Sequence, residues 1–144
     1  MSQPVAYWDS SALVPLCVPQ IQTTRASALY ESYGVVSWWA TQVEMISGLT
    51  RLERMGQISH DQFLAGKELA RYIVRDWISA GSSASIAVDA CLVLELFPLR
   101  TADALQLSVA LEACEHNPQG YVFVTADQRL ADAARQSGFS VEFL

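Results

Sequence analysis

The sequence predicts an α/β fold, a three-layer α/β/α sandwich in which helices cover both faces of a mainly parallel sheet. Segments of strand and helix character alternate along the chain, and the strand segments are apolar runs without strict polar alternation. The 144 residues are 51% hydrophobic and 17% charged, which excludes disorder and provides enough apolar surface for one core. We therefore expect residues 1–144 to form a single domain.

Four short apolar runs are predicted to be the strands of the sheet. Polar residues, Gly or Pro bound these runs, as is typical of buried parallel strands. In chain order they cover residues 5–8, 35–39, 121–124 and 139–144. Trp8, Trp38 and Trp39 fall in or beside the first two strands and are expected to pack in the core.

The segments between the strands are predicted to be helices, because they combine apolar residues near helical spacing with start and stop signals. Ser10 or Ser11 and Thr101 are expected caps, and Gly34, Gly56 and Gly138 are expected end signals. After a short helix that Pro19 stops, the expected helices cover residues 20–33, 41–55, 59–77, 86–97, 102–114 and 127–137. A strand remains the alternative for residues 86–97, which contain several β-branched side chains.

Two helix starts carry the capping-box pattern, in which a Ser or Thr is followed three residues later by Gln or Glu. One is Ser59 with Gln62, and the other is Thr41 with Glu44. The residues expected to face inward from the helix that Ser59 caps are Phe63, Leu64, Leu69, Tyr72, Ile73 and Trp77.

The charge and the cysteines disfavour several classes of protein. Nine Lys and Arg against 15 Asp and Glu give a net charge of −6, which disfavours a general binder of nucleic acid or anionic membranes. Cys17, Cys91 and Cys114 include no C-x-x-C pair, so we expect buried free thiols in a reducing compartment. No secretory signal and no bilayer-length apolar run is visible, so a cytoplasmic location without membrane contact is expected.

Four carboxylates are predicted to meet at one edge of the sheet, where the strands end and the following helices begin. Asp9 and Asp127 follow strands, Glu44 lies in the first turn of helix 41–55, and Asp103 opens helix 102–114. Each acid alone has a structural alternative, because acidic residues also cap helices and complement the helix dipole. Together they would repel one another unless a cation neutralised them, and Mg²⁺ or Mn²⁺ suits such oxygen ligands.

A divalent cation held by carboxylates indicates hydrolytic chemistry. Such an ion lowers the pKa of a bound water and stabilises the oxygens of a phosphodiester displacement. The sequence shows no nucleophilic triad and no Gly-rich phosphate loop. His60 and His116 have no partner at metal-ligand spacing and are expected at the surface.

Four blocks of the sequence together resemble the PIN domain family, and within it the VapC toxins of bacterial toxin–antitoxin pairs. The blocks are Trp8-Asp9-Ser10-Ser11-Ala12-Leu13, Glu44 ahead of Leu49-Thr50-Arg51-Leu52, the run from Leu99 to Leu107 around Asp103, and Val124-Thr125-Ala126-Asp127-Gln128-Arg129-Leu130. The resemblance implies a Mg²⁺- or Mn²⁺-dependent ribonuclease that forms homodimers and is inhibited by a small VapB-type antitoxin. It maps the family's four acidic positions onto Asp9, Glu44, Asp103 and Asp127.

An RNA substrate is compatible with the charge once these acids are assigned to a metal site. Without the four site carboxylates, 11 acidic residues remain against nine basic ones, a net charge of −2. Arg100 is the candidate phosphate contact, and Arg51, Arg54 and Arg129 are weaker candidates. Ser10 and Thr125 lie beside the acids and are candidates to bind a carboxylate, water or phosphate. We expect selective, shape-dependent recognition of RNA.

Two alternative functions stay open at this point. One is a non-catalytic PIN module that only binds RNA or protein, and the other is an RNA-processing PIN nuclease without an antitoxin. Two classes that also place an aspartate after the first strand do not fit. A haloacid-dehalogenase-type phosphatase needs a second Asp where Ser11 stands, and a receiver domain needs a late Lys, whereas the only lysine is Lys67 in a mid-chain helix.

Overall fold

The sheet consists of five parallel strands in the order β3-β2-β1-β4-β5. This computed structural model describes residues 2–144. The strands are β1 (Val5–Trp8), β2 (Gly34–Ser37), β3 (Ile78–Ser79), β4 (Val122–Thr125) and β5 (Ser140–Phe143). The first strand lies in the centre, where Tyr7 pairs with Val36 of β2 on one side and with Phe123 of β4 on the other.

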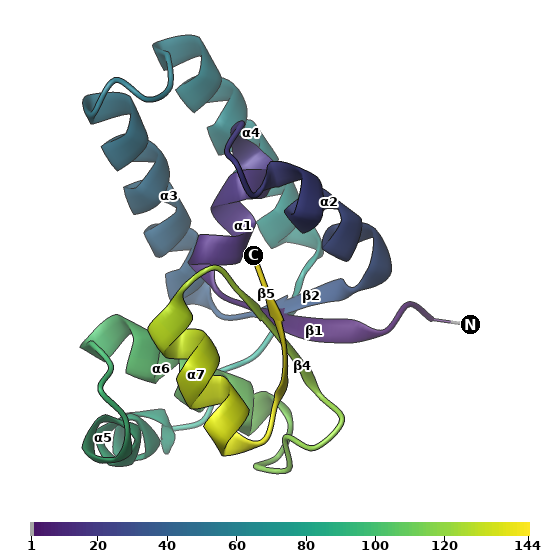
Figure 1. The fold of residues 1–144 in the computed structure, drawn as a ribbon, viewed down its shortest axis with the longest axis vertical. Coiled ribbons are helices and arrows are strands. Elements are labelled where there is room, and N and C mark those ends of the chain that lie inside the picture. Colours follow the sequence, from purple (N-terminus) through teal and green to yellow (C-terminus); the bar gives the residue numbers. More distant parts are fainter. Residues whose placement is uncertain (1) are drawn as a thin grey trace.

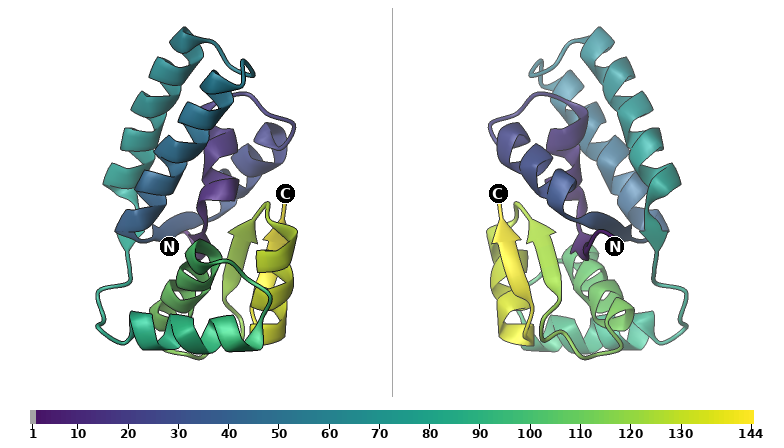
Figure 2. Two further views of the ribbon diagram at one scale, coloured as in Figure 1. Left: turned by 90° about the vertical axis from the view of Figure 1, so that its left-hand side faces the viewer. Right: turned by 90° about the vertical axis from the view of Figure 1, so that its right-hand side faces the viewer.

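Helices cover both faces of the sheet, which confirms the predicted three-layer α/β/α sandwich (Figures 1 and 2). One face carries α1 (Ser10–Cys17), α2 (Thr23–Ser32), α3 (Trp39–Arg54) and α4 (His60–Asp76), and the other carries α5 (Ile86–Leu96), α6 (Thr101–Ala113) and α7 (Gln128–Ser137). Because side chains alternate along a strand, β1 contributes to both cores. Ala6 and Trp8 pack in the core beneath α1–α4, and Tyr7 packs in the core beneath α5–α7.

Several helix ends agree with the sequence signals. Ser59 caps α4 through a complete capping box, in which its hydroxyl accepts from the Gln62 amide at 3.1 Å and the Gln62 side chain accepts from the Ser59 amide at 2.8 Å. Gly138 follows α7 with φ of +111°, a conformation that glycine adopts without strain.

The predicted caps of α1 and α6 are wrong, because Asp9 and Arg100 occupy the cap positions and Ser10 and Thr101 are already helical.

The structure corrects the boundaries around the second strand. The helix expected from residue 20 begins at Thr23, and Gly34 opens β2 instead of ending that helix. The strand ends at Ser37, and α3 starts at Trp39, so Thr41 lies inside the helix and its capping box with Glu44 is wrong. The Thr41 hydroxyl instead lies 2.8 Å from that of Ser37.

The helix α4 presents a narrower buried stripe than predicted. Its buried residues are Gly66, Ala70 and Ile73, whereas Leu64, Leu69 and Tyr72 are exposed. A Cβ atom at position 66 would lie 2.8 Å from Cγ1 of Val18, so α4 approaches the end of α1 more closely than a larger residue permits. This close approach leaves the larger apolar side chains on the flanks of the helix.

Two other burial predictions are wrong. Trp8 and Trp38 are buried as expected, but Trp39 is 69% exposed because it opens α3 at the surface. Cys17 and Cys114 are buried free thiols, whereas Cys91 is an exposed one on α5.

Residues 86–96 form the helix α5 and not the alternative strand. The strand β3, which the sequence analysis missed, has only two residues and pairs Ile78 with Val36 of β2. Within residues 2–144, no helix combines the length and the apolar character needed to cross a membrane.

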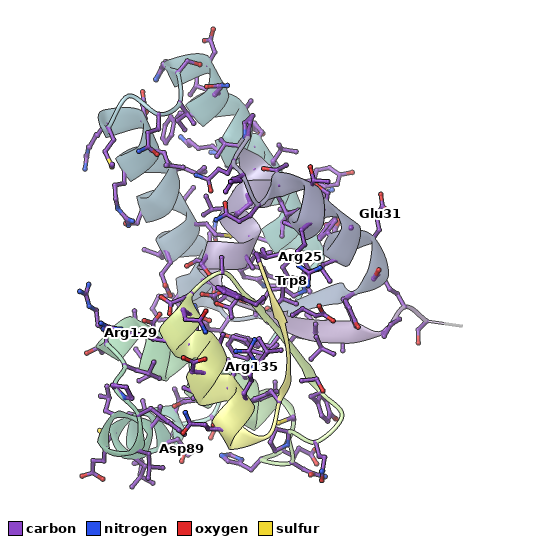
Figure 3. The ribbon with its side chains drawn as sticks, in the orientation of Figure 1. Trp8, Arg25, Glu31, Asp89, Arg129 and Arg135 are labelled. Atoms are coloured by element: carbon purple, nitrogen blue, oxygen red, sulfur yellow. The ribbon has the colours of Figure 1, made fainter. Side chains whose placement is uncertain are left out.

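The last strand is held against the α1–α4 face by a side-chain contact. Arg25 of α2 donates to the Glu142 carboxylate at 2.8 Å and to the Phe143 carbonyl at 2.9 Å (Figure 3). This contact joins β5, at one edge of the sheet, to the helical layer that also carries α1 and α3.

Candidate acidic site at the carboxyl edge of the sheet

The structure places all four predicted carboxylates where strands end and helices begin. Asp9 directly follows β1 and is the N-cap of α1, and Asp127 is the N-cap of α7, just after β4. Asp103 lies in the first turn of α6, and Glu44 lies in the second turn of α3 because that helix starts earlier than expected. Neighbouring parallel strands β1 and β4 therefore bring together acids that are more than 100 residues apart in the chain.

Asp9 is the most buried member of this group, with 3% of its surface exposed. The Ser11 hydroxyl donates to its carboxylate, with Oγ 2.8 and 2.9 Å from the two oxygens, and itself accepts from the Ala126 amide at 2.8 Å. These contacts connect the end of β1 to the loop after β4. Burial raises the pKa of Asp9 from 3.8 to about 7, the Ser11 and Thr125 hydroxyls oppose this rise, and the nearby Asp103 charge adds to it.

Asp103 and Asp127 share a hollow of about 310 Å³ with Arg100 and Arg129. Burial, the Asp127 charge and the Glu44 charge raise the pKa of Asp103 to about 6, and Arg100 opposes the rise. Figure 3 labels Arg129 near the start of α7, on the side next to α6. The hollow therefore presents two carboxylates and two guanidinium groups together, which suits a metal-bridged phosphate.

Asp127 also caps a helix, which is the structural role that its position at a helix start suggested. Its Oδ1 accepts from the Leu130 amide at 2.9 Å, which caps α7. The Thr125 hydroxyl accepts from the Asp127 amide at 3.0 Å, so Thr125 orients the loop that carries this acid.

Glu44 is held by two side-chain donors. Gln106 Nε2 donates to its Oε1 at 2.8 Å, and the Ser10 hydroxyl donates to its Oε2 at 3.3 Å. Burial raises the pKa of Glu44, and these two hydrogen bonds oppose the rise. A second hollow, of about 300 Å³, lies beside Glu44 and is lined in part by Ser10, Gln22 and Arg51.

Gln106 is a site residue that the sequence analysis missed. It is fully buried on α6, its Oε1 accepts from the Tyr7 hydroxyl, and its Nε2 donates to Thr41 at 2.9 Å as well as to Glu44. The amide thus connects the central strand to Glu44 through hydrogen bonds. The sequence does contain one signal for this role, because Gln106 is a polar residue within the largely apolar run 104–110, one helical turn after Asp103.

The remaining predicted polar residues lie farther from this group. Arg54 lines a groove along α3 together with Arg51. His60 pairs with Glu53 at 2.7 Å and His116 with Asp89 at 3.3 Å, and both histidines are exposed, as predicted.

The donor set suits a hard divalent cation by its chemistry, because carboxylates are the oxygen ligands that such ions prefer. Burial first, and then nearby acidic charges, raise the pKa values of Asp9 and Asp103. Among the residues the structure describes, no three acidic, His or Cys side chains form a ready-made metal cluster. The backbone brings the acids to one edge, and their side chains would have to adjust before three of them could hold one ion.

We expect the substitution Gln106→Leu to change the pH dependence of the site. Loss of its amide removes a hydrogen bond that favours the charged form of Glu44, so the pKa of Glu44 rises further. If activity depends on ionised Glu44, the acid limb of the pH–activity profile then moves to higher pH. The substitution also leaves the buried polar groups that Gln106 contacts without a partner, which lowers the free energy of unfolding by about 1–3 kcal/mol. Activity measured between pH 5 and 9 tests the shift.

The matched control for this prediction is Tyr7→Phe. It removes the Tyr7 donor to Gln106 but leaves the bond from Gln106 to Glu44 in place. We expect it to lower stability without moving the acid limb. An identical pH profile for Gln106→Leu and wild type would contradict the assigned role of Gln106.

Comparisons with known proteins identify the fold. No family model and no curated protein sequence matches the chain. The crystal structure of PAE2754 from Pyrobaculum aerophilum is similar, with a TM-score of 0.61 and 19% identity over 96% of this chain and 92% of that one. A toxin–antitoxin complex from Klebsiella pneumoniae gives a TM-score of 0.59 and 14% identity, covering 88% of this chain and 90% of that one. The chain therefore shares the α/β fold of these two proteins over most of its length.

Proposed function

We propose that the protein is a divalent-metal-dependent endoribonuclease of the PIN type, which hydrolyses RNA phosphodiesters. The observation that carries the proposal is the position of Asp9, Glu44, Asp103 and Asp127 at the carboxyl edge of the sheet, where the strands end and the following helices begin. Two of these acids have pKa values raised toward neutrality, partly by their acidic neighbours. Such mutual repulsion lowers stability, and a bound cation would relieve it.

The proposed metal ligands follow the resemblance of the four sequence blocks, and the hydrogen bonds of the site assign the residues that orient them. Asp9 and Asp103 are the most direct ligands for Mg²⁺ or Mn²⁺, and Glu44 and Asp127 bind the ion or an attacking water. When bound, the ion supplies a nucleophile by lowering the pKa of water and stabilises the phosphodiester oxygens. Ser11 orients Asp9, and Ser10 and Gln106 orient Glu44.

RNA is proposed to approach across the two hollows beside the acids. Arg100 and Arg129 line one hollow with Asp103 and Asp127, and Arg51 lines the other beside Glu44. Guanidinium groups on both sides can bind the phosphates that flank the cleaved bond. Thr125 supports this surface by orienting Asp127 through its backbone amide.

We further propose that the protein is the toxin of a VapBC-type pair, acting as a homodimer that a VapB-type antitoxin inhibits. The resemblance of the four sequence blocks and the shared fold with the Klebsiella pneumoniae toxin–antitoxin complex support this assignment. Co-expression with the product of an adjacent small open reading frame tests it. Copurification of the two proteins with loss of RNA cleavage is expected, whereas unimpaired cleavage would favour an RNA-processing nuclease without an antitoxin.

The decisive experiment is cleavage of total RNA by the purified protein with Mg²⁺ or Mn²⁺, beside an EDTA control. Discrete fragments that require the metal and are absent with Asp103→Asn are expected. A binding-only module is the alternative, favoured by the lack of a ready-made three-ligand cluster among residues 2–144. Folded protein that binds no Mn²⁺ in calorimetry and cleaves no RNA would support that alternative and overturn the nuclease.

A further inference from the structure

The arginines of the chain divide into two groups by their partners. Within residues 2–144, one group forms salt bridges with carboxylates and consists of Arg25, Arg71, Arg75 and Arg135. The other group is in no salt bridge of the described chain, and its members line hollows at the acidic edge or next to it: Arg51, Arg54, Arg100 and Arg129. Free guanidinium groups are therefore concentrated on one part of the surface, where they can bind an anionic ligand.

One of these hollows is a groove of about 370 Å³ along α3. Its lining consists of Val43, Ile46, Ser47, Thr50, Arg51 and Arg54, and so contains two cations and no acidic residue. Arg51 also lines the hollow beside Glu44. The groove therefore adjoins the acidic site through Arg51 and leads away from it along the helix.

The face of α3 that forms the groove begins with an exposed aromatic side chain. Trp39 precedes Val43 by one helical turn, so the two side chains are neighbours on the same face of the helix. Trp39 is 69% exposed, and its ring packs against that of the buried Trp38 with 5.4 Å between the ring centroids. The contact with Trp38 restrains the Trp39 ring while most of its surface stays open to a ligand, which suits a platform for base stacking.

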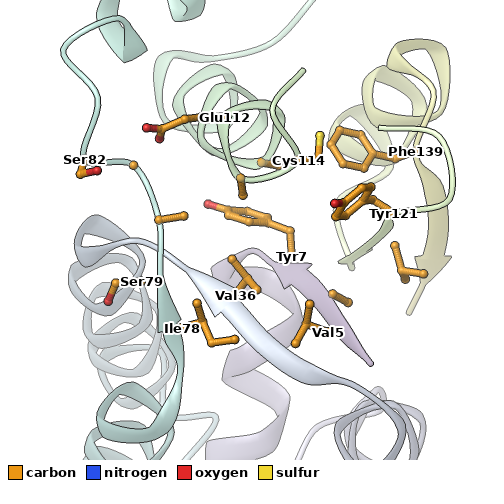
Figure 4. Close-up of a pocket in the computed structure, with 16 residues that line it drawn as sticks. Val5, Tyr7, Val36, Ile78, Ser79, Ser82, Glu112, Cys114, Tyr121 and Phe139 are labelled. Atoms are coloured by element: carbon orange, nitrogen blue, oxygen red, sulfur yellow. The ribbon is translucent and has the colours of Figure 1, made fainter. Parts of the chain in front are cut away.

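The opposite end of the sheet has no comparable surface. A cavity of about 420 Å³ lies there, lined in part by Val5 and Val122, the first residues of β1 and β4. Its lining contains no Lys, Arg or His, and Figure 4 shows Glu112 as the charged side chain in its wall. An anionic ligand is therefore favoured on α3 and disfavoured at this cavity.

A single strand of RNA fits this face of α3 better than a second copy of the chain does. In a symmetric dimer the patch would meet itself, so Arg51 and Arg54 would face a groove lining without a carboxylate. Burial of cations without an opposite charge costs free energy. RNA offers phosphates to the arginines, and an unpaired strand also offers a base to Trp39.

We propose that the face of α3 from Trp39 to Arg54, which we name the α3 track, binds single-stranded RNA next to the cleaved bond. A base stacks on Trp39, and Arg51 and Arg54 bind phosphates of the same strand. The track extends for about 22 Å at 1.5 Å per helical residue. This inference rests on the proposed function, because the bound strand is the substrate whose phosphodiester lies at the acidic edge.

Binding of a fluorescein-labelled oligouridylate to the full-length chain in EDTA tests the track without cleavage. Fluorescence anisotropy at several salt concentrations gives the Kd for the single strand and for the same strand annealed to oligoadenylate. Trp39→Ala is expected to weaken binding of the single strand by roughly five- to a hundredfold, because a stacked base is lost. Arg54→Gln is expected to reduce the slope of log K against log salt by about 0.7, because one phosphate contact is lost.

Tyr72→Ala and Arg75→Gln are the matched controls. They alter an aromatic–arginine pair on α4, in which the Arg75 guanidinium lies 4.3 Å from the Tyr72 ring centroid, outside the groove. Both controls should keep the wild-type Kd and salt slope. Wild-type binding by Trp39→Ala and Arg54→Gln, equal affinity of wild type for strand and duplex, or no binding by wild type would overturn the proposal.

Cleavage assays with Mn²⁺ separate the α3 track from the nuclease activity. RNA that binds with the expected variant effects but is never cut would support the track and overturn the nuclease. RNA that wild type, Trp39→Ala and Arg54→Gln cut at equal rates and bind equally would support the nuclease and overturn the track. Sedimentation velocity tests the other occupant: a dimer that Trp39→Ala converts to monomer, with unchanged RNA binding, would show a contact between copies and overturn the proposal.

Discussion

Asp103→Asn and Asp9→Asn are each expected to lower metal-dependent RNA cleavage by roughly a hundredfold or more. Each replaces an anionic oxygen pair with a neutral amide, which weakens binding of a divalent cation at the most direct proposed ligands. The fold should persist, because mutual repulsion among the acids contributes to the raised pKa values of Asp9 and Asp103 and is relieved by either change. Initial cleavage rates at saturating Mn²⁺ measure the effect.

Asp61→Asn is the matched control for Asp103→Asn. Both acids lie in the first turn of a helix, Asp61 in α4 and Asp103 in α6, but Asp61 is exposed and outside the acidic site. If Asp103 only complemented the dipole of α6, the two substitutions would cost similar stability and neither would affect cleavage. Retention of wild-type activity in Asp103→Asn would remove it from the proposed metal site.

The stability of the metal-free protein is expected to fall as the pH rises from about 4 to 7. Asp9 has a folded pKa of about 7 against 3.8 unfolded, so within this window the folded state binds more protons. The contribution of protonated Asp9 to the free energy of unfolding is fully present below pH 3.8 and is lost as the pH rises through 7. At 1.36 kcal/mol per pKa unit, the loss is at most about 4 kcal/mol.

Urea unfolding in EDTA at pH 5 and pH 8 tests this titration. Wild type should lose roughly 3 kcal/mol between these values relative to Asp9→Asn, which stays neutral throughout. Added Mg²⁺ should restore stability at pH 8 in wild type more than in the variant, because it binds the ionised carboxylates. The free energy of unfolding of Asp61→Asn should change between the two pH values as that of wild type does. An equal change in wild type and in Asp9→Asn would contradict the raised pKa of Asp9.

The layers of the fold could be predicted from local signals, whereas elements set by distant contacts could not. Residues 5–8 and 121–124 are continuous apolar runs, so a strand formed by either run is apolar on both faces. Such strands are typical of a parallel sheet that helices cover on both sides. The strand β3 has two residues and depends on pairing with β2, so its sequence contains no period to detect. The exposed Leu64 and Leu69 were expected inside because their spacing could not show that α4 packs through Gly66.

The acids of the candidate site could be predicted, but most of their partners could not. Asp9, Asp103 and Asp127 follow strand ends or open helices, so topology alone brings them to one edge. Gln106 is recognised only in the folded structure, where its amide on α6 meets Glu44 of α3 from a position 62 residues away in the chain. The prediction of a capping box at Thr41 was wrong because Trp38, and not Thr41, occupies the cap position of α3.

The central place of β1 also determines when the acids can meet during synthesis. Asp9 emerges from the ribosome long before β4, the second neighbour of β1, which begins at Val122. Until then the nascent chain lacks Asp127 and the loop amide of Ala126 that Ser11 engages. A growing chain beside ribosomal RNA and its own messenger therefore carries an incomplete acidic edge, and assembly of that edge waits until the loop after β4 has been synthesised.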